Sequence, residues 1–187
     1  ISNLMATMCG KAKIPSGVVN ILHGNAKVGK ALVQNKDVAL ISFTGSTQAG
    51  KWIAREAGKR LARVSLELGG KNSLVVCDDA DIDHAVKWAL LSSFSNAGQR
   101  CAASSRILVF KSIEDEFCKK FVHAAKNLRL GVGANSDIGP VINKQAEQRI
   151  LAHIEHAKKQ GVEILCGGNK EPSKSLKEGY YIQPTIF

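Results

Sequence analysis

The sequence predicts an α/β protein built on a parallel β-sheet, followed by part of a second α/β domain. Short apolar runs suited to buried strands alternate with segments of helical periodicity, an order that favours parallel strands joined by right-handed crossovers. A Gly69-Gly70 break then separates this part from a downstream segment with its own helices and strands. The composition, 44% apolar and 22% charged, is typical of a soluble globular protein.

The upstream segment starts with a helix that Gly10 and Pro15 end, because proline disfavours helical geometry in the residue before it. Continuous apolar runs such as Val18-Val19-Asn20-Ile21-Leu22 favour strands buried on both faces. The expected order is a helix over 1–12, a strand over 17–22, a helix over 28–33, a strand over 38–43, a helix from 44 to about 58, and a strand over 64–68.

The downstream segment contains Asp78-Asp79-Ala80-Asp81, whose carboxylates suit the start of a helix. Apolar residues at four-residue intervals then mark the buried stripe of that helix. The expected order is a strand over 73–77, a helix over 81–96, a strand over 106–110, a helix over 113–128, a loop over 131–143, a helix over 144–160, a strand over 162–166, a polar loop over 167–179, and an unfinished strand over 180–187.

The five cysteines are odd in number and far apart, which argues against a disulfide framework and against a paired-cysteine zinc site. No apolar run approaches the roughly 18 residues that cross a bilayer, so we expect a cytoplasmic protein with reduced thiols and no membrane partner. The net charge of +10 comes from scattered lysines and arginines without interleaved aromatic residues. We therefore expect a solvated basic surface that attracts anionic ligands, and no nucleic-acid partner.

The stretch Leu66-Glu67-Leu68-Gly69-Gly70-Lys71-Asn72 has the pattern of a strand that ends at a flexible break. Alternation places Glu67 on the face opposite the leucines. A solvent-facing carboxylate with no special role is the ordinary interpretation of such a residue. A functional carboxylate beside the Gly69-Gly70 break is the alternative.

Thr44-Gly45-Ser46-Thr47 follows a predicted strand and opens a predicted helix, an arrangement that suits an anion. Free backbone N–H groups and the positive end of the helix dipole face such a turn. Gly24 and Gly29 bracket the preceding helix start at the same expected edge of the sheet, where cofactors bind in this topology. A Ser or Thr here is also a common N-cap with no ligand, and the spacing is not the G-x-G-x-x-G fingerprint.

Cys101 lies beside Arg100, just after the Gly98 break. A neighbouring cation enlarges the thiolate fraction of a cysteine, which is its nucleophilic form. The alternative is a small buried apolar residue, the interpretation we favour for the other four thiols, Cys9, Cys77, Cys118 and Cys166. His153 and His156 lack a nearby third ligand, so no metal site is expected.

Three motifs together resemble the aldehyde dehydrogenase superfamily: Phe43-Thr44-Gly45-Ser46-Thr47, Leu66-Glu67-Leu68-Gly69-Gly70-Lys71 and Gly98-Gln99-Arg100-Cys101, in this order and at these separations. The resemblance covers essentially the whole chain. It implies a Rossmann-like NAD(P)-binding domain ending within residues 1–68 and the start of a catalytic domain in residues 69–187. The loop from Gly24 to Gly29 is one residue shorter than the commonest family loop.

The resemblance implies roles for particular residues. Cys101 would be the nucleophile that forms a thiohemiacetal and then a thioester, and Glu67 the general base that activates water. NAD or NADP would be the cofactor and a small-molecule aldehyde the substrate. The cofactor-binding residues would be Gly45, Ser46, Gly50, Leu68, Gly24 and Gly29.

The resemblance also implies that the chain is an internal segment of a homo-oligomeric enzyme, a dimer or tetramer, and that the isolated segment is inactive. An oxyanion-binding asparagine and a ribose-binding lysine would precede Ile1, and a second glutamate motif would follow Phe187. Two alternatives stay open: a coenzyme-A-acylating semialdehyde dehydrogenase, against which Glu67 counts, and a non-catalytic binding protein on the same fold.

Overall fold

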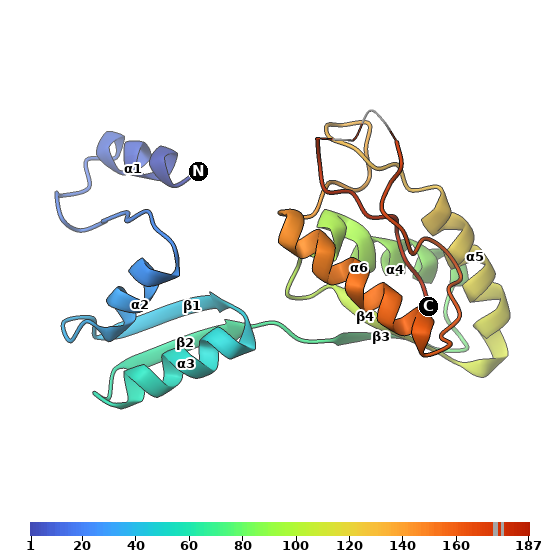
Figure 1. Ribbon diagram of the computed structural model, residues 1–187, viewed down its shortest axis with the longest axis horizontal. Helices are drawn as coiled ribbons and strands as arrows, with labels where there is room; N and C mark the ends of the chain where they lie inside the picture. The colour runs from blue at the N-terminus through green and yellow to red at the C-terminus, as the bar shows by residue number, and fades with distance from the viewer. Residues whose placement is uncertain (174–175, 177) are drawn as a thin grey trace. The chain divides into compact units, whose positions relative to one another are not determined.

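The computed structural model describes residues 1–173, 176 and 178–187 (Figure 1). The chain divides into two compact units, Ile1–Gly69 and Gly70–Phe187. Each unit contains one pair of parallel strands with helices packed against it. The predicted α/β class with parallel strands is therefore confirmed.

The first unit runs α1 (Ser2–Lys11), α2 (Ala26–Gln34), β1 (Leu40–Gly45), α3 (Thr47–Gly58) and β2 (Arg63–Leu68). β1 and β2 pair in parallel along their whole lengths, with Leu40 opposite Arg63 and Gly45 opposite Leu68. The crossover between them is α3, which Figure 1 shows alongside both strands. Its buried face carries Gly50, Ile53 and Ala57.

Side chains tie the loops of this unit to its helices. Asn25 caps α2 by accepting a hydrogen bond from the Lys27 backbone N–H at 2.9 Å. The Arg60 guanidinium donates to the backbone carbonyls of Val33, in the last turn of α2, and of Val38, between α2 and β1. The carbonyls in the last turn of a helix have no partner within it, so this side chain satisfies one of them.

The strand expected over 17–22 is wrong. In this fully described unit β1 and β2 pair only with each other, and 17–22 forms turns and irregular backbone. Val18 and Leu22 are 66% and 64% exposed. An apolar run becomes a strand only where a neighbouring strand accepts its backbone hydrogen bonds, and neither strand of this unit does so here.

The second unit begins with β3 (Asn72–Val76), α4 (Ile82–Phe94), a 3₁₀ turn (Ser95–Gly98) and β4 (Ser104–Val109). A short 3₁₀ turn (Lys111–Ile113) leads into α5 (Glu114–Lys126), and α6 (Lys144–Lys159) follows a long loop. Asp81 caps α4 as expected, accepting a hydrogen bond from the His84 backbone N–H at 2.9 Å. β3 and β4 pair in parallel, with an irregular register between Asn72 and Ser73.

The core of this unit lies between β3, α4 and α5. Its buried members are Val76, Val86, Ala89, Phe117 and Phe121. The rings of Phe117 and Phe121 stack with centroids 5.5 Å apart. The four-residue stripe predicted for α4 lies against this cluster, with Val86 buried and Ile82, Leu90 and Phe94 partly buried, so the expected buried face of that helix is confirmed.

The strands expected over 162–166 and 180–187 are wrong for the residues that the structure describes. The two segments form one isolated antiparallel bridge, Cys166 with Ile186, and Lys170 in the following loop forms a second with Ile182. Single bridges do not continue into a ladder, so the segments remain irregular. Within the loop expected over 167–179, residues 174, 175 and 177 lie outside the described part of the chain.

Candidate functional site

The turn between β1 and α3 carries Gly45 and Ser46. Ser46 is exposed and caps α3, its Oγ accepting a hydrogen bond from the Ala49 backbone N–H at 3.2 Å. The first backbone N–H groups of an α-helix have no partner within the helix, so the start of α3 offers donors and positive dipole to an anion. The N-cap interpretation and the anion interpretation of Ser46 are compatible, because the cap uses the hydroxyl as acceptor and leaves its proton to donate.

Two other predicted cofactor residues, Leu68 of β2 and Gly50 of α3, pack against each other. Leu68 is half-buried at the end of β2, and its side chain covers Gly50 of α3. A Cβ atom on Gly50 would lie 2.6 Å from Leu68 Cδ2, which is well inside van der Waals contact. The packing of β2 on α3 therefore accounts for a glycine at position 50.

The remaining predicted cofactor residues flank the start of α2. A Cβ atom on Gly24 would overlap the Val28 side chain, whereas one on Gly29 would meet no atom within 4 Å. Packing thus explains why position 24 has no side chain. Nothing in the structure explains the glycine at position 29.

Glu67 lies on β2 opposite Thr44 of β1, one residue before the end of the strand. Its side chain is exposed, and Leu66 and Leu68 on the other face are half-buried. The predicted alternation is confirmed. Thr47 Oγ1 donates to the carbonyl of Gly69 at 3.4 Å, so the start of α3 also holds the chain just beyond Glu67.

Cys101 is exposed and lies in a turn that follows an unusual stretch of backbone. Asn96 and Ala97 have φ values of 53° and 54°, and Gly98 has a φ of 70°. The left-handed region costs an L-residue such as Ala97 about 1–2 kcal/mol, so surrounding contacts must hold the loop in place. Strain of this kind is typical of functional loops.

Two amide side chains supply those contacts. Asn72 Nδ2 donates to the carbonyl oxygens of Cys101 at 2.7 Å and Ala103 at 3.1 Å. Gln99 Nε2 donates to the carbonyl of Asn96 at 3.0 Å, and Gln99 Oε1 accepts from the Ile142 backbone N–H at 2.9 Å. Asn72 therefore ties the turn from Cys101 to Ala103 to β3, and Gln99 ties the loop before Cys101 to the segment before α6.

The backbone N–H of Cys101 takes part in no hydrogen bond among the described residues. It is thus available to an oxygen atom of a ligand. Arg100, the expected activating cation, donates to Ser95 Oγ at 2.9 Å. Its guanidinium therefore also helps to hold the loop.

The other thiols differ from the expectation that all four are buried. Cys166 is buried, Cys9 and Cys118 are half-buried, and Cys77 is exposed. Cys77 directly follows the last residue of β3, so its side chain lies beyond the packed part of the sheet. The expectation of burial rested on the usual apolar behaviour of a free cysteine, which this position does not follow.

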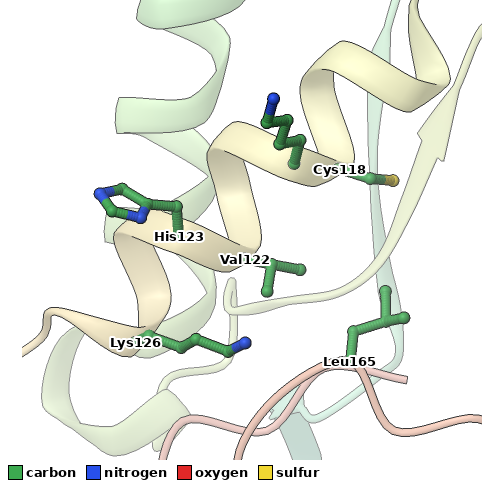
Figure 2. Close-up of a pocket in the computed structure, with 6 residues that line it drawn as sticks. Cys118, Val122, His123, Lys126 and Leu165 are labelled. Carbon is green, nitrogen blue, oxygen red and sulfur yellow. The ribbon is translucent and has the colours of Figure 1, made fainter.

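Cys118 lines a shallow opening on α5, where Figure 2 shows it with Val122, His123, Lys126 and Leu165. Burial raises the pKa of the Cys118 thiol, and Glu114 and Asp115 raise it further. A raised pKa reduces the thiolate fraction. Cys118 is therefore a poor candidate for a nucleophile, although it stands beside a lysine and a histidine.

Glu67 and the predicted cofactor residues belong to the first unit, and Cys101 to the second. The contacts described above for these residues therefore each lie within a single unit. The sequence assigned no role to Asn72 or Gln99, whose amides help to hold the Cys101 loop. The signals for them were that Asn72 ends the stretch from Leu66 to Asn72 and that Gln99 lies in the Gly98-Gln99-Arg100-Cys101 motif.

Among the described residues, no His, Cys, Asp or Glu side chains form a group of three or more that could hold a metal ion. No helix in the described part of the chain is long and apolar enough to span a membrane. The first unit holds an exposed carboxylate, Glu67, and the start of α3, and the second unit holds an exposed thiol, Cys101.

The fold and these residues define an α/β protein with an exposed thiol on a strained, anchored loop. A sequence model of the aldehyde dehydrogenase family matches residues 1–187. The chain belongs to the aldehyde dehydrogenase family.

Individual relatives agree with that assignment. The chain is 45% identical to aldehyde dehydrogenase 1A1 of Mesocricetus auratus, over 98% of this chain and 36% of that protein. It is 41% identical to a D-glyceraldehyde dehydrogenase (NADP(+)) of Picrophilus torridus, over 94% of this chain and 36% of that protein. The chain thus spans a little over a third of the length of the curated relatives it matches.

Solved structures show the same likeness. HpcC from Thermus thermophilus superposes with a TM-score of 0.95 at 36% identity, over 100% of this chain and 38% of that one. A structure of PnpE from Pseudomonas sp. WBC-3 and one of PnpE in complex with nicotinamide adenine dinucleotide each have a TM-score of 0.95 at 37% identity, over 98% of this chain and 38% of that one.

Proposed function

We propose that the protein carrying this chain oxidises an aldehyde to a carboxylic acid, with NAD or NADP as the oxidant. The observation that carries this proposal is the exposed Cys101 on its anchored loop, with a free backbone N–H, in a chain of the aldehyde dehydrogenase family. The names of relatives support both cofactors, since one includes NADP(+) and one structure contains nicotinamide adenine dinucleotide.

Cys101 is the proposed nucleophile. Its thiolate attacks the aldehyde carbon, and the carbonyl oxygen becomes the oxyanion of a thiohemiacetal. The Cys101 backbone N–H, which has no partner among the described residues, is the donor that we propose for this oxyanion. Loss of hydride from that carbon leaves a thioester on Cys101.

Glu67 is the proposed general base. An exposed carboxylate can accept a proton from water, and the resulting hydroxide attacks the thioester carbon and expels the Cys101 thiolate. The overall balance is aldehyde, water and oxidised cofactor giving carboxylic acid, reduced cofactor and a proton. A proton acceptor is needed at this step because water is a poor nucleophile.

NAD(P) accepts the hydride when it is bound. The start of α3 fits a pyrophosphate group, since the Ser46 hydroxyl is exposed and the first backbone N–H groups of a helix have no partner in the helix backbone. We assign cofactor contacts to Gly45, Ser46 and Leu68, with Gly50, Gly24 and Gly29 beside them. On this proposal residues 1–68 complete the cofactor domain and residues 69–187 begin the catalytic domain.

We further propose that the protein acts in the cytoplasm as a dimer or tetramer. One relative, from Mus musculus, is named aldehyde dehydrogenase, cytosolic 1, which supports the compartment. The substrate is proposed only as a class, a small-molecule aldehyde.

Replacement of Cys101 by serine tests the catalytic assignment. We expect Cys101→Ser to abolish aldehyde-dependent formation of reduced cofactor, and Cys118→Ser, a matched change at a half-buried thiol, to leave it within about twofold. Iodoacetamide should label Cys101 before Cys118. Full activity of Cys101→Ser would refute the proposed nucleophile.

A further inference from the structure

Cys101 lies between two peptide groups, and a hydrogen bond holds the carbonyl of each. The Arg100 carbonyl accepts from the Ala103 backbone N–H at 3.2 Å, and the Cys101 carbonyl accepts from Asn72 Nδ2 at 2.7 Å. A trans peptide is planar, with its N–H opposite its C=O. The bond to the Arg100 carbonyl therefore sets the direction of the Cys101 N–H. The bond to the Cys101 carbonyl sets the orientation of the peptide group between Cys101 and Ala102.

Both bonds depend on the conformation of the short turn from Arg100 to Ala103, and Asn72 holds that turn at two points. Its amide nitrogen donates to Cys101 O and, at 3.1 Å, to Ala103 O. An amide NH₂ has two protons in one plane, so a single Asn72 side chain can satisfy both carbonyls. Aspartate has the same shape but carries no such protons when it is ionised.

Asn72 itself is firmly placed. It is the first residue of β3 and pairs with Ser104 of β4, while the next residue, Ser73, pairs with Arg106. The register therefore skips one residue of β4 directly beside the Cys101 turn, a type of irregularity that re-aims neighbouring groups. Pairing with β4 fixes the position of Asn72, and the Asn72 side chain then holds the backbone turn from Arg100 to Ala103.

We propose that Asn72 is a positioning residue for catalysis: its amide sets the orientation of the Cys101 main chain and hence the relation between the thiol and the oxyanion-binding N–H. This inference rests on the proposed function, since it gives Cys101 the nucleophilic role. Among the described residues, the hydrogen bonds of the Asn72 side chain go to the backbone carbonyls of Cys101 and Ala103, so it acts through the loop and not on the reacting atoms.

The test compares Asn72→Asp and Asn72→Ala with Asn127→Asp in the protein that carries this chain. Asn127 is a matched control because its Nδ2 also donates to a backbone carbonyl, that of His123 at 3.0 Å, at the end of α5. Asn72→Asp keeps the side-chain volume and removes the donor. Asn72→Ala removes the donor without adding charge, and covers the case in which the aspartate variant does not fold.

Two measurements are made on each variant. Hydrogen exchange of the peptide covering residues 96–103 should become about tenfold faster or more in both Asn72 variants and stay unchanged in Asn127→Asp. The kcat for aldehyde oxidation should fall about 10- to 100-fold, with KM for NAD(P) within about twofold, because a small misplacement of reacting groups acts on the chemical step.

Unchanged exchange in residues 96–103, or a kcat within about twofold of the parent, would overturn the inference. An equal loss in Asn127→Asp would also overturn it, since the effect would then be general destabilisation. The two proposals can fail separately. If Cys101→Ser is fully active, the proposed function fails, while the exchange measurement still reports whether Asn72 anchors the loop.

Discussion

The Leu68 side chain lies over the bare Cα of Gly50, so close that a Cβ atom there would come within 2.6 Å of Leu68 Cδ2. This contact joins the last residue of β2 to the first half of α3. Glu67 directly precedes Leu68, and Ser46 caps the same helix. The packing of one leucine on one glycine therefore sets the spacing between the strand that carries the proposed base and the helix that carries the proposed phosphate site.

The first prediction compares alanine at two helical glycines. Gly29→Ala in α2 meets open space and should stabilise the first unit by up to about 1 kcal/mol through helix propensity. Gly50→Ala gains the same propensity but displaces Leu68, so it should be less stable than Gly29→Ala by about 1–3 kcal/mol. Denaturant unfolding followed by Trp52 fluorescence, in a Trp88→Phe background, measures the difference. Equal stability of the two variants would contradict the close packing.

The second prediction separates the two roles of Ser46. Ser46→Asp keeps a good N-cap but places a negative charge at the proposed pyrophosphate site, so it should retain stability and weaken NAD(P) binding at least tenfold. Ser46→Ala should lose about 0.5–2 kcal/mol of stability from the missing cap. Calorimetric titration with NAD(P) measures the cofactor affinity of each variant, and denaturant unfolding measures its stability, so the two roles are separated. Undiminished cofactor affinity in Ser46→Asp would remove Ser46 from the cofactor site.

The third prediction concerns Glu67. Glu67→Gln should still form the thioester, giving one burst of reduced cofactor per active site, while steady-state turnover falls about 10²- to 10⁴-fold for want of a general base. Stopped-flow measurement of reduced cofactor resolves the two phases. Glu163→Gln, a change at another exposed glutamate, serves as the control. Loss of the burst would show that Glu67 acts before hydride transfer, and unchanged turnover would exclude it as the base.

The fourth prediction concerns the loop that approaches Gln99. Arg129 donates to Asp137 through its side-chain Nε at 3.0 Å and through its backbone N–H at 2.9 Å, and these bonds lower the pKa of Asp137 from 3.8 to about 2. A lowered folded-state pKa gives stability that is present above the unfolded-state value and is lost as pH falls toward 2. Asp137→Asn should therefore be less stable than the parent at neutral pH, with the difference shrinking below about pH 4.

Titration of the Asp137 carboxyl group by NMR, with unfolding measured across the same pH range, checks this prediction. Arg129→Met provides the control, because removing the guanidinium should return the midpoint toward 3.8. The pair is exposed to solvent, so its contribution should also decline at high salt. A midpoint that stays near 4 in the parent would contradict the ion pair.

Local sequence signals predicted the helices and the strands β1 to β4 closely. Asp81 and Ser46 are caps at the predicted helix starts, and alternation placed Glu67 on the exposed face. These features depend on neighbouring residues only. The strand expected over 17–22 failed because a strand also needs a partner, and the apolar run carries no information about that.

The motifs of this sequence determined its family, its parallel α/β fold and the residues Cys101 and Glu67 as candidates for chemistry. Tertiary structure alone decided how Cys101 is held. Asn72 and Cys101 are 29 positions apart, and only the parallel pairing of β3 with β4, with its skipped residue, brings the amide onto the carbonyl. Periodicity and capping are local and can be read along the chain, whereas a hydrogen bond between distant residues depends on the register of the folded sheet.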